Sequence, residues 1–183
     1  MLGFPLGILS AAGAGGVAGT YELIETYILG SNQSEVSFSS LATYASTYKH
    51  LQIRMVALGT TSVDNQIIRL NGDTGNNYNS HFLFGDGSSV GSGVYTPKDK
   101  IYIGNSSITA NQFTAVVVDI LDAFSSTKNT TVRALYGNVG TPNVVQLLSG
   151  AWFNTASLTS ISVARLSNNY TTGSRFSLYG IRG

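Results

Sequence analysis

The chain has 183 residues, of which 43% are apolar and only 10% are charged, and its formal net charge is +1. This apolar content excludes an intrinsically disordered chain, and the near-neutral balance argues against nucleic-acid binding, which usually needs a clustered basic face. The absence of cysteine excludes disulfides and thiolate metal sites. A surface so poor in charge favours a component of a larger assembly over a free monomer.

The first twenty residues contain no charged side chain and include six glycines. These glycines and Pro5 oppose a stable helix, and the lack of flanking basic residues opposes a secretory signal or a membrane span. We predict an extended anchoring arm over residues 1–20, with residues 11–19 as a pliable connector; the alternative is a disordered tail. The side chains expected to bury against another subunit are Leu2, Phe4, Leu6, Ile8 and Leu9.

The segment after the arm predicts two strands, at 21–29 and 35–39, followed by one helical turn within 41–48. Alternating apolar residues then predict strands at 51–57 and 66–70. We expect these two strands to pair as an antiparallel hairpin. The Asn71-Gly72-Asp73 sequence that follows is typical of a tight turn, because asparagine and glycine tolerate positive φ.

The second half repeats short extended runs separated by glycine- or asparagine-rich turns. Residues 85–93 are predicted to form a long turn. The runs at 94–95 and 101–103 indicate edge-like strand, broken by Pro97 because proline cannot donate to a ladder. The run at 113–121 is the most apolar and should be a central strand, and Trp152 should lie in the core. The expected strands are 80–84, 94–95, 101–103, 113–121, 128–136, 144–153, 158–166 and 174–181.

Nine or ten short strands at spacings near ten residues, without a long helix, predict an all-β fold. We expect a jelly-roll-like two-sheet β-sandwich over residues 21–183, preceded by the extended apolar N-terminal arm.

The titratable residues form no pattern typical of catalysis or of metal binding. His50 and His81 are the only histidines, and no third nitrogen or sulfur ligand accompanies them, so we predict no metal role for either. We expect each imidazole to lie at a strand edge and to bond to the backbone. Asp119 and Asp122 could serve a hydrolase as an acid and base pair, but formation of a turn over residues 122–125 explains Asp122 more simply. We therefore predict no enzymatic activity and no cofactor.

Two polar loops are the remaining candidates for ligand binding. The oxygen-rich loop with Asn71, Asp73, Asn76 and Asn77 could approach a calcium ion, yet it lacks the carboxylates of a recognised calcium loop. Aromatic and amide side chains on such loops could also bind sugars. The residues expected to contact a ligand or partner are Asn76, Asn77, Tyr78, Asp86 and Ser88.

Several stretches together resemble structural proteins of tailed bacteriophages, particularly those that infect aquatic bacteria. The resemblance covers nearly the whole chain and rests on MLGFPLGILSAAGAGG with YELIETYIL, on YKHLQIRMVALGTTSVDNQIIRLNGDTGNNY, and on VQLLSGAWFNTASLTSISV with TTGSRFSLYGIRG. It implies a non-enzymatic virion protein with a β-sandwich fold that assembles as a homotrimer.

From this resemblance we expect the protein to lie on the surface of a phage particle, on the head or on the tail. The expected role is capsid decoration (cement) or a tail-fibre or tail-tip subunit, and the expected partners are copies of the chain and other virion proteins, with no nucleic acid and no membrane. The alternative is a carbohydrate-binding module of a tail fibre that recognises glycans on the host surface.

Overall fold

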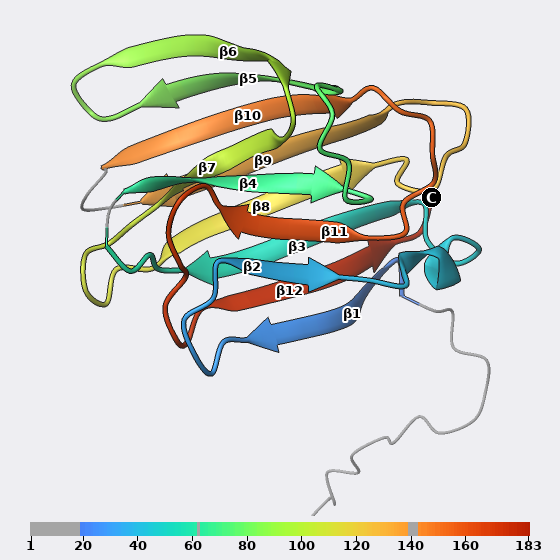
Figure 1. Ribbon diagram of the computed structural model, residues 1–183, viewed down its shortest axis with the longest axis horizontal. Coiled ribbons are helices and arrows are strands. Elements are labelled where there is room, and N and C mark those ends of the chain that lie inside the picture. The colour runs from blue at the N-terminus through green and yellow to red at the C-terminus, as the bar shows by residue number, and fades with distance from the viewer. Residues whose placement is uncertain (1–18, 62, 139–142) are drawn as a thin grey trace, which may run out of the picture.

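The computed structural model describes residues 19–61, 63–138 and 143–183, which form a β-sandwich of two antiparallel sheets (Figure 1). The larger sheet has eight strands in the order β1 (Tyr21–Ile28), β12 (Arg175–Ile181), β3 (His50–Ala57), β8 (Thr114–Leu121), β9 (Thr130–Asn138), β10 (Val144–Trp152), β5 (Tyr78–Gly85) and β6 (Val90–Lys98). The smaller sheet has four strands in the order β2 (Glu35–Phe38), β11 (Ile161–Arg165), β4 (Asp64–Leu70) and β7 (Ile101–Ser106).

Alternation along the strands of the large sheet places one set of side chains in the core and the other set on the outer face. In β9 the inward side chains Val132, Ala134 and Tyr136 are buried, because successive residues of a strand point to opposite faces. Burial of each large apolar side chain contributes about 1.5–3 kcal/mol. The two-sheet sandwich predicted from the alternation is thus confirmed. The largest buried side chains are Trp152, Tyr78, Tyr136, Tyr170, Phe38 and Phe176.

Several predicted elements are confirmed. The strand at 21–29 is β1, the helical turn is a 3₁₀ helix over Leu41–Tyr44, and the most apolar run forms β8 between β3 and β9 in the large sheet. Asn71 and Gly72 adopt φ values of 52° and 66° in the predicted turn. Strand β6 lies at an edge of the large sheet as expected, but the expected break at Pro97 is wrong, because β6 continues through it to Lys98.

The predicted hairpin between 51–57 and 66–70 is wrong. β3 pairs with β12 and β8 in the large sheet, whereas β4 pairs with β11 and β7 in the small sheet. Directly after β3, Leu58 forms a bridge with Ser107 and Gly59 forms one with Tyr170. Both strands bury an apolar face, and both faces are covered when the strands lie in opposite layers of one core.

The predicted long turn at 85–93 is also wrong in extent, because β6 already begins at Val90 and only 86–89 connects the two strands. Gly91 and Gly93 are strand residues of β6. A Cβ on Gly91 or Gly93 would lie 2.6 or 2.5 Å from a ring carbon of Phe84 or Phe82, respectively. Glycine is required here because the two rings lie directly against the backbone of β6.

Candidate interaction surface

The outer face of the large sheet carries many exposed aliphatic side chains. Among the described residues, fifteen large hydrophobic side chains are exposed, and ten of them are aliphatic residues on this face. Single exposed hydrophobic residues are ordinary, but a contiguous group of them marks a contact surface. The ten residues are Leu23, Ile28, Val56, Leu83, Val90, Val94, Val117, Leu135, Val145 and Leu147.

Strand register brings these side chains together. Val117 of β8 is paired with Leu135 of β9, Leu135 with Leu147 of β10, and Leu147 with Leu83 of β5. We call these four residues the apolar row. Directly paired side chains on one face lie about 5 Å apart, so the apolar row forms a continuous strip across four strands. Half of the Leu135 side chain (53%) and half of Leu147 (50%) remain exposed to solvent.

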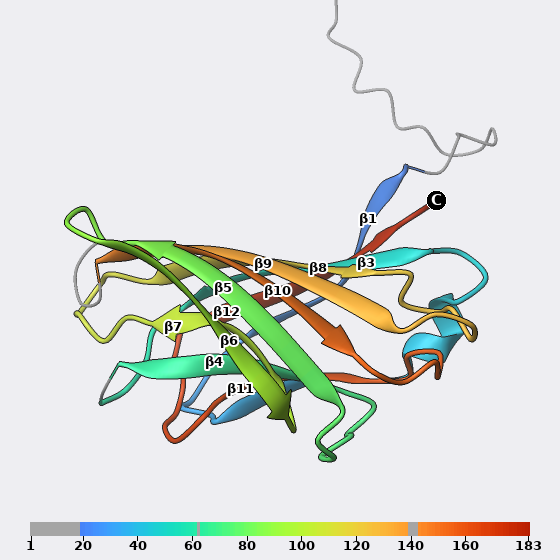
Figure 2. The same cartoon turned by 90° about the horizontal axis from the view of Figure 1, so that it is seen from above.

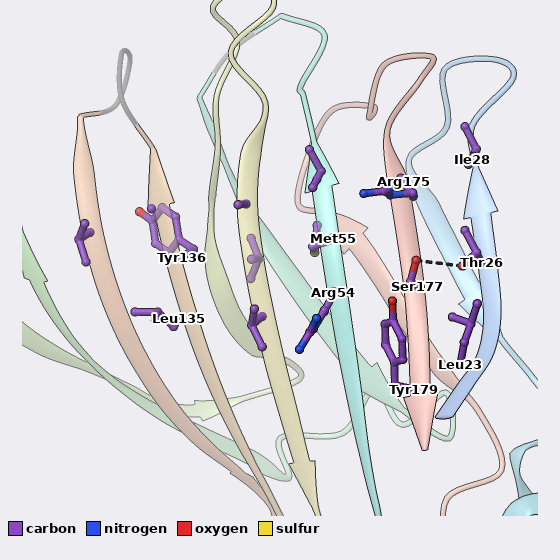
Figure 3. Close-up of a pocket in the computed structure, with 16 residues that line it drawn as sticks. Leu23, Thr26, Ile28, Arg54, Met55, Leu135, Tyr136, Arg175, Ser177 and Tyr179 are labelled. Atoms are coloured by element: carbon purple, nitrogen blue, oxygen red, sulfur yellow. Dashed lines mark hydrogen bonds between the residues drawn. The ribbon is translucent and has the colours of Figure 1, made fainter. Parts of the chain in front are cut away.

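A hollow of about 760 Å³, which we call the trough, lies on this face and is lined by residues of β1, β12, β3, β8, β9 and β10 (Figure 3). The lining includes the small residues Ala115, Gly137 and Ser177. It also includes the larger aliphatic residues Leu23, Ile28, Leu135 and Val145. The charged residues in the lining are Arg54 and Arg175, and no acidic side chain lines the trough.

A polar network borders the trough and holds Arg54 in place. The Nε of Arg54 donates to Oε1 of Gln52 at 2.9 Å, and the Tyr21 hydroxyl donates to the same oxygen at 2.7 Å. The Nε2 of Gln52 donates to Asp119 at 2.7 Å. The Arg54 guanidinium also lies over the rings of Tyr21 and Tyr179, at 5.1 and 5.4 Å from their centroids. These contacts fix a positive charge at the edge of an apolar surface.

The two predicted ligand loops do not form one site. Asn76 and Asn77 precede β5 and Asp86 and Ser88 follow it, so the length of this eight-residue strand separates them; eight residues of strand span about 26 Å. The Asp86 carboxylate accepts bonds from the backbone and hydroxyl of Ser88 at 2.9 Å, which stabilises the loop itself.

The expectation that Tyr78 contacts a ligand is wrong. Its side chain is fully buried, and its ring stacks on Trp152 with centroids 6.3 Å apart. The hydroxyl donates to a backbone carbonyl, that of Leu70 at 3.2 Å or that of Asp73 at 3.1 Å. Burial raises the pKa of Tyr78 to about 12. Tyr78 follows the loop directly, but as the first residue of β5 it points into the core because the alternation of the strand begins there.

The Asp73 carboxylate of the oxygen-rich loop is bonded within the protein. The Asp73 carboxylate accepts bonds from Trp152 Nε1 at 2.7 Å, from the Gly75 amide at 2.8 Å and from Asn77 Nδ2 at 3.0 Å. The bond from Trp152 is the main reason that the pKa of Asp73 lies below its ordinary value. Within the described ranges, no three histidine, cysteine or acidic side chains gather at a spacing that suits a metal ion.

Asp119 and Asp122 have separate structural roles. Asp119 lies on the outer face and accepts from Gln52, whereas Asp122 adopts a φ of 51° in a turn closed by a bond from the Ser125 amide to its carbonyl at 2.9 Å. The predicted turn is therefore confirmed, although the carboxylate itself pairs with Lys128 at 2.8 Å. The Nδ1 of His50 accepts from the Asp122 amide at 2.9 Å, which confirms the backbone bond predicted for it.

The predicted arm residues Leu2, Phe4, Leu6, Ile8 and Leu9 lie outside the described residues. The apolar outer face, in contrast, was missed at the level of sequence. A signal for it was present: the run Val116-Val117-Val118 and the pair Leu147-Leu148 place apolar residues on both faces of a strand, which is typical of strands covered on both sides.

No helix among the described residues is long and apolar enough to cross a bilayer. The chain matches no protein-family model, and no curated protein sequence matches it. The exposed apolar face of the large sheet is therefore the main candidate for a functional surface.

Proposed function

We propose that this chain is a non-enzymatic structural protein of a bacteriophage particle, which assembles with copies of itself through the outer face of its large sheet. The observation that carries the assembly is the apolar row beside the trough, because these side chains stay exposed in a single copy. The low charge of the chain supports it further, since a free monomer with such a face would be prone to aggregate.

The sequence resemblance to tailed-phage structural proteins supports the location on the particle surface, as a capsid decoration protein or a tail-fibre or tail-tip subunit. In this role the β-sandwich is structural. The carboxylates of Asp119 and Asp122 are bonded to Gln52 and Lys128, respectively. A homotrimer is the assembly that the resemblance implies. The partners are therefore neighbouring copies and other virion proteins.

The oligomeric state of the full chain tests the proposal. Light scattering coupled to size exclusion should give a mass of several chains, three for the implied trimer. Leu135→Asp should shift the protein toward the monomer, because a carboxylate in an apolar contact loses its hydration. Thr131→Asp is the matched control, since Thr131 is exposed on the same strand and the same face but lies outside the apolar row. A monomeric wild-type chain, or an unchanged mass for Leu135→Asp, would contradict assembly through this face.

The virion location needs a separate measurement. An antibody raised against the folded chain should label intact particles of the virus that encodes it, on the head or on the tail, in negatively stained electron micrographs. The protein should also co-sediment with purified particles at a fixed copy number. If the protein stayed entirely in the soluble fraction of the lysate, the virion role would be wrong even if the chain formed oligomers.

A further inference from the structure

The trough suits an occupant that is largely apolar and carries no positive charge. Its lining is mostly apolar, and its charged lining residues, Arg54 and Arg175, are both cationic. Two such hollow faces placed against each other would leave space between them, whereas a single extended segment could fill the hollow. An extended segment also offers backbone carbonyls, to which the guanidinium groups of both arginines can donate.

The chain itself contains a segment of this kind in residues 1–18, which lie outside the described part. From Leu2 to Ile8 every second residue is large and apolar, and glycine or Pro5 separates them. Pro5 favours extended backbone for itself and for the residue before it. In extended form the large side chains all point to one side. The four large residues are Leu2, Phe4, Leu6 and Ile8.

The dimensions of the segment and of the trough agree. Six residue steps from Leu2 to Ile8 cover roughly 20 Å at about 3.3 Å per residue. Residues of six adjacent strands line the trough, and five strand spacings of about 4.8 Å amount to roughly 24 Å. The segment is also free of charge, so it carries no cation that the two arginines would repel.

Gly19 and Thr20 continue β1 beyond its first residue. The Arg182 amide donates to the Thr20 carbonyl at 3.0 Å, and Arg182 Nε donates to the Gly19 carbonyl at 3.2 Å. These bonds extend the β1–β12 ladder beyond Tyr21, at the end of β1 opposite to Ile28, and the start of β1 lies beside the C-terminus (Figure 2). The described chain therefore begins at the end of β1 that lies opposite Ile28.

We propose that the segment from Leu2 to Ile8 of one copy occupies the trough of a neighbouring copy. Residues 11–19, rich in glycine and alanine, would span the gap between copies. Such a contact joins two different surfaces, and repetition of it closes a ring when the rotation between copies permits. This inference rests on the proposed assembly and names the surface and the segment that form its contact.

Engineered cysteines test the pairing directly, because the natural chain contains none. Full-length Leu6→Cys is mixed with full-length Leu135→Cys under mild oxidation, and covalent dimers that contain one chain of each kind are quantified. The matched control replaces Leu135→Cys by Thr131→Cys, which is exposed on the same strand and face. We expect on the order of ten times more mixed dimer with Leu135→Cys, since seating of the segment raises the effective concentration of the two thiols.

Other outcomes would overturn the pairing. Equal yields from the Leu135→Cys and Thr131→Cys mixtures would show that the segment does not seat in the trough. A disulfide that forms within a doubly substituted chain, but not between mixed chains, would place the segment in its own trough. Predominant Leu135→Cys homodimers would indicate that two faces meet directly.

Deletion of residues 1–16 separates failure of this pairing from failure of the proposed function. The pairing predicts that the deleted chain loses its assembly and becomes monomeric. If the deletion left the oligomer intact while Leu135→Asp dissociated it, assembly through the face would stand and the seated segment would be wrong. A full-length chain that is monomeric at every concentration would remove both.

Discussion

The bond between Trp152 and Asp73 should be one of the strongest single polar contributions to the stability of the fold. Trp152 is almost fully buried, and its indole Nε1 donates to the Asp73 carboxylate at 2.7 Å. Asp73→Ala would leave this buried donor without an acceptor. A bond to a charged group contributes about 1.5–3 kcal/mol, and the Gly75 and Asn77 donors are exposed and add little. We therefore expect Asp73→Ala to lower the free energy of unfolding by about 2–3 kcal/mol.

Chemical denaturation followed by far-ultraviolet circular dichroism measures this loss, at one protein concentration for all variants because assembly would otherwise shift the midpoint. Trp152→Phe removes the donor but keeps an aromatic ring. The double variant should then cost less than the sum of the two single variants, by about 1–2 kcal/mol of coupling. Two results would refute this reasoning. One is a loss below about 0.5 kcal/mol for Asp73→Ala, which lies within the range of ordinary surface substitutions. The other is additive effects in the double variant.

The Asp73 carboxylate should also make the free energy of unfolding depend on pH. The hydrogen bond from Trp152 holds the pKa of Asp73 below its ordinary value of 3.8. In the unfolded chain the ordinary pKa applies, so the stabilisation is present above about pH 4 and is lost as pH falls through the folded-state pKa. Asp73→Asn should therefore reduce the difference in stability between pH 7 and pH 3, and an unchanged difference would contradict the assignment.

Two further substitutions probe other parts of the sandwich. Gly104→Ala should lower the free energy of unfolding by about 2–4 kcal/mol in the same denaturation assay. The reason is that Gly104 has a φ of 132° and that a Cβ added there would lie 2.4 Å from the Tyr136 ring. A loss under about 1 kcal/mol would contradict the close contact. At Asp99, burial alone would raise the pKa, but hydrogen bonds from Lys100 and Arg69 hold it at about 2. The ionised Asp99 therefore stabilises the fold above about pH 4, and this stabilisation is lost as pH falls through 2. Asp99→Asn should lower the free energy of unfolding by about 1 kcal/mol at pH 7 and by almost nothing at pH 2. An equal loss at both pH values would refute the ion pair.

The sequence by itself determined the all-β character of the fold and the alternation within its strands. Strand β9 is an example: its two sets of side chains alternate in the sequence, and the structure places Val132 and Tyr136 in the core and Arg133 outside. The reason is local: successive side chains of an extended backbone point to opposite faces, so the pattern fixes the buried face without knowledge of the partner strand. The tight turn at Asn71 was equally readable, because positive φ restricts the choice of residue.

Only the tertiary structure decided which strands pair. β3 and β4 are neighbours in sequence, yet they lie in different sheets, and β1 pairs with β12 from the far end of the chain. Alternation cannot distinguish a partner beside a strand from one across the core, because both choices bury the same side chains. The candidate surface depends on this pairing. Leu135 and Leu147 both point outward, and they form an apolar row because the register places them side by side.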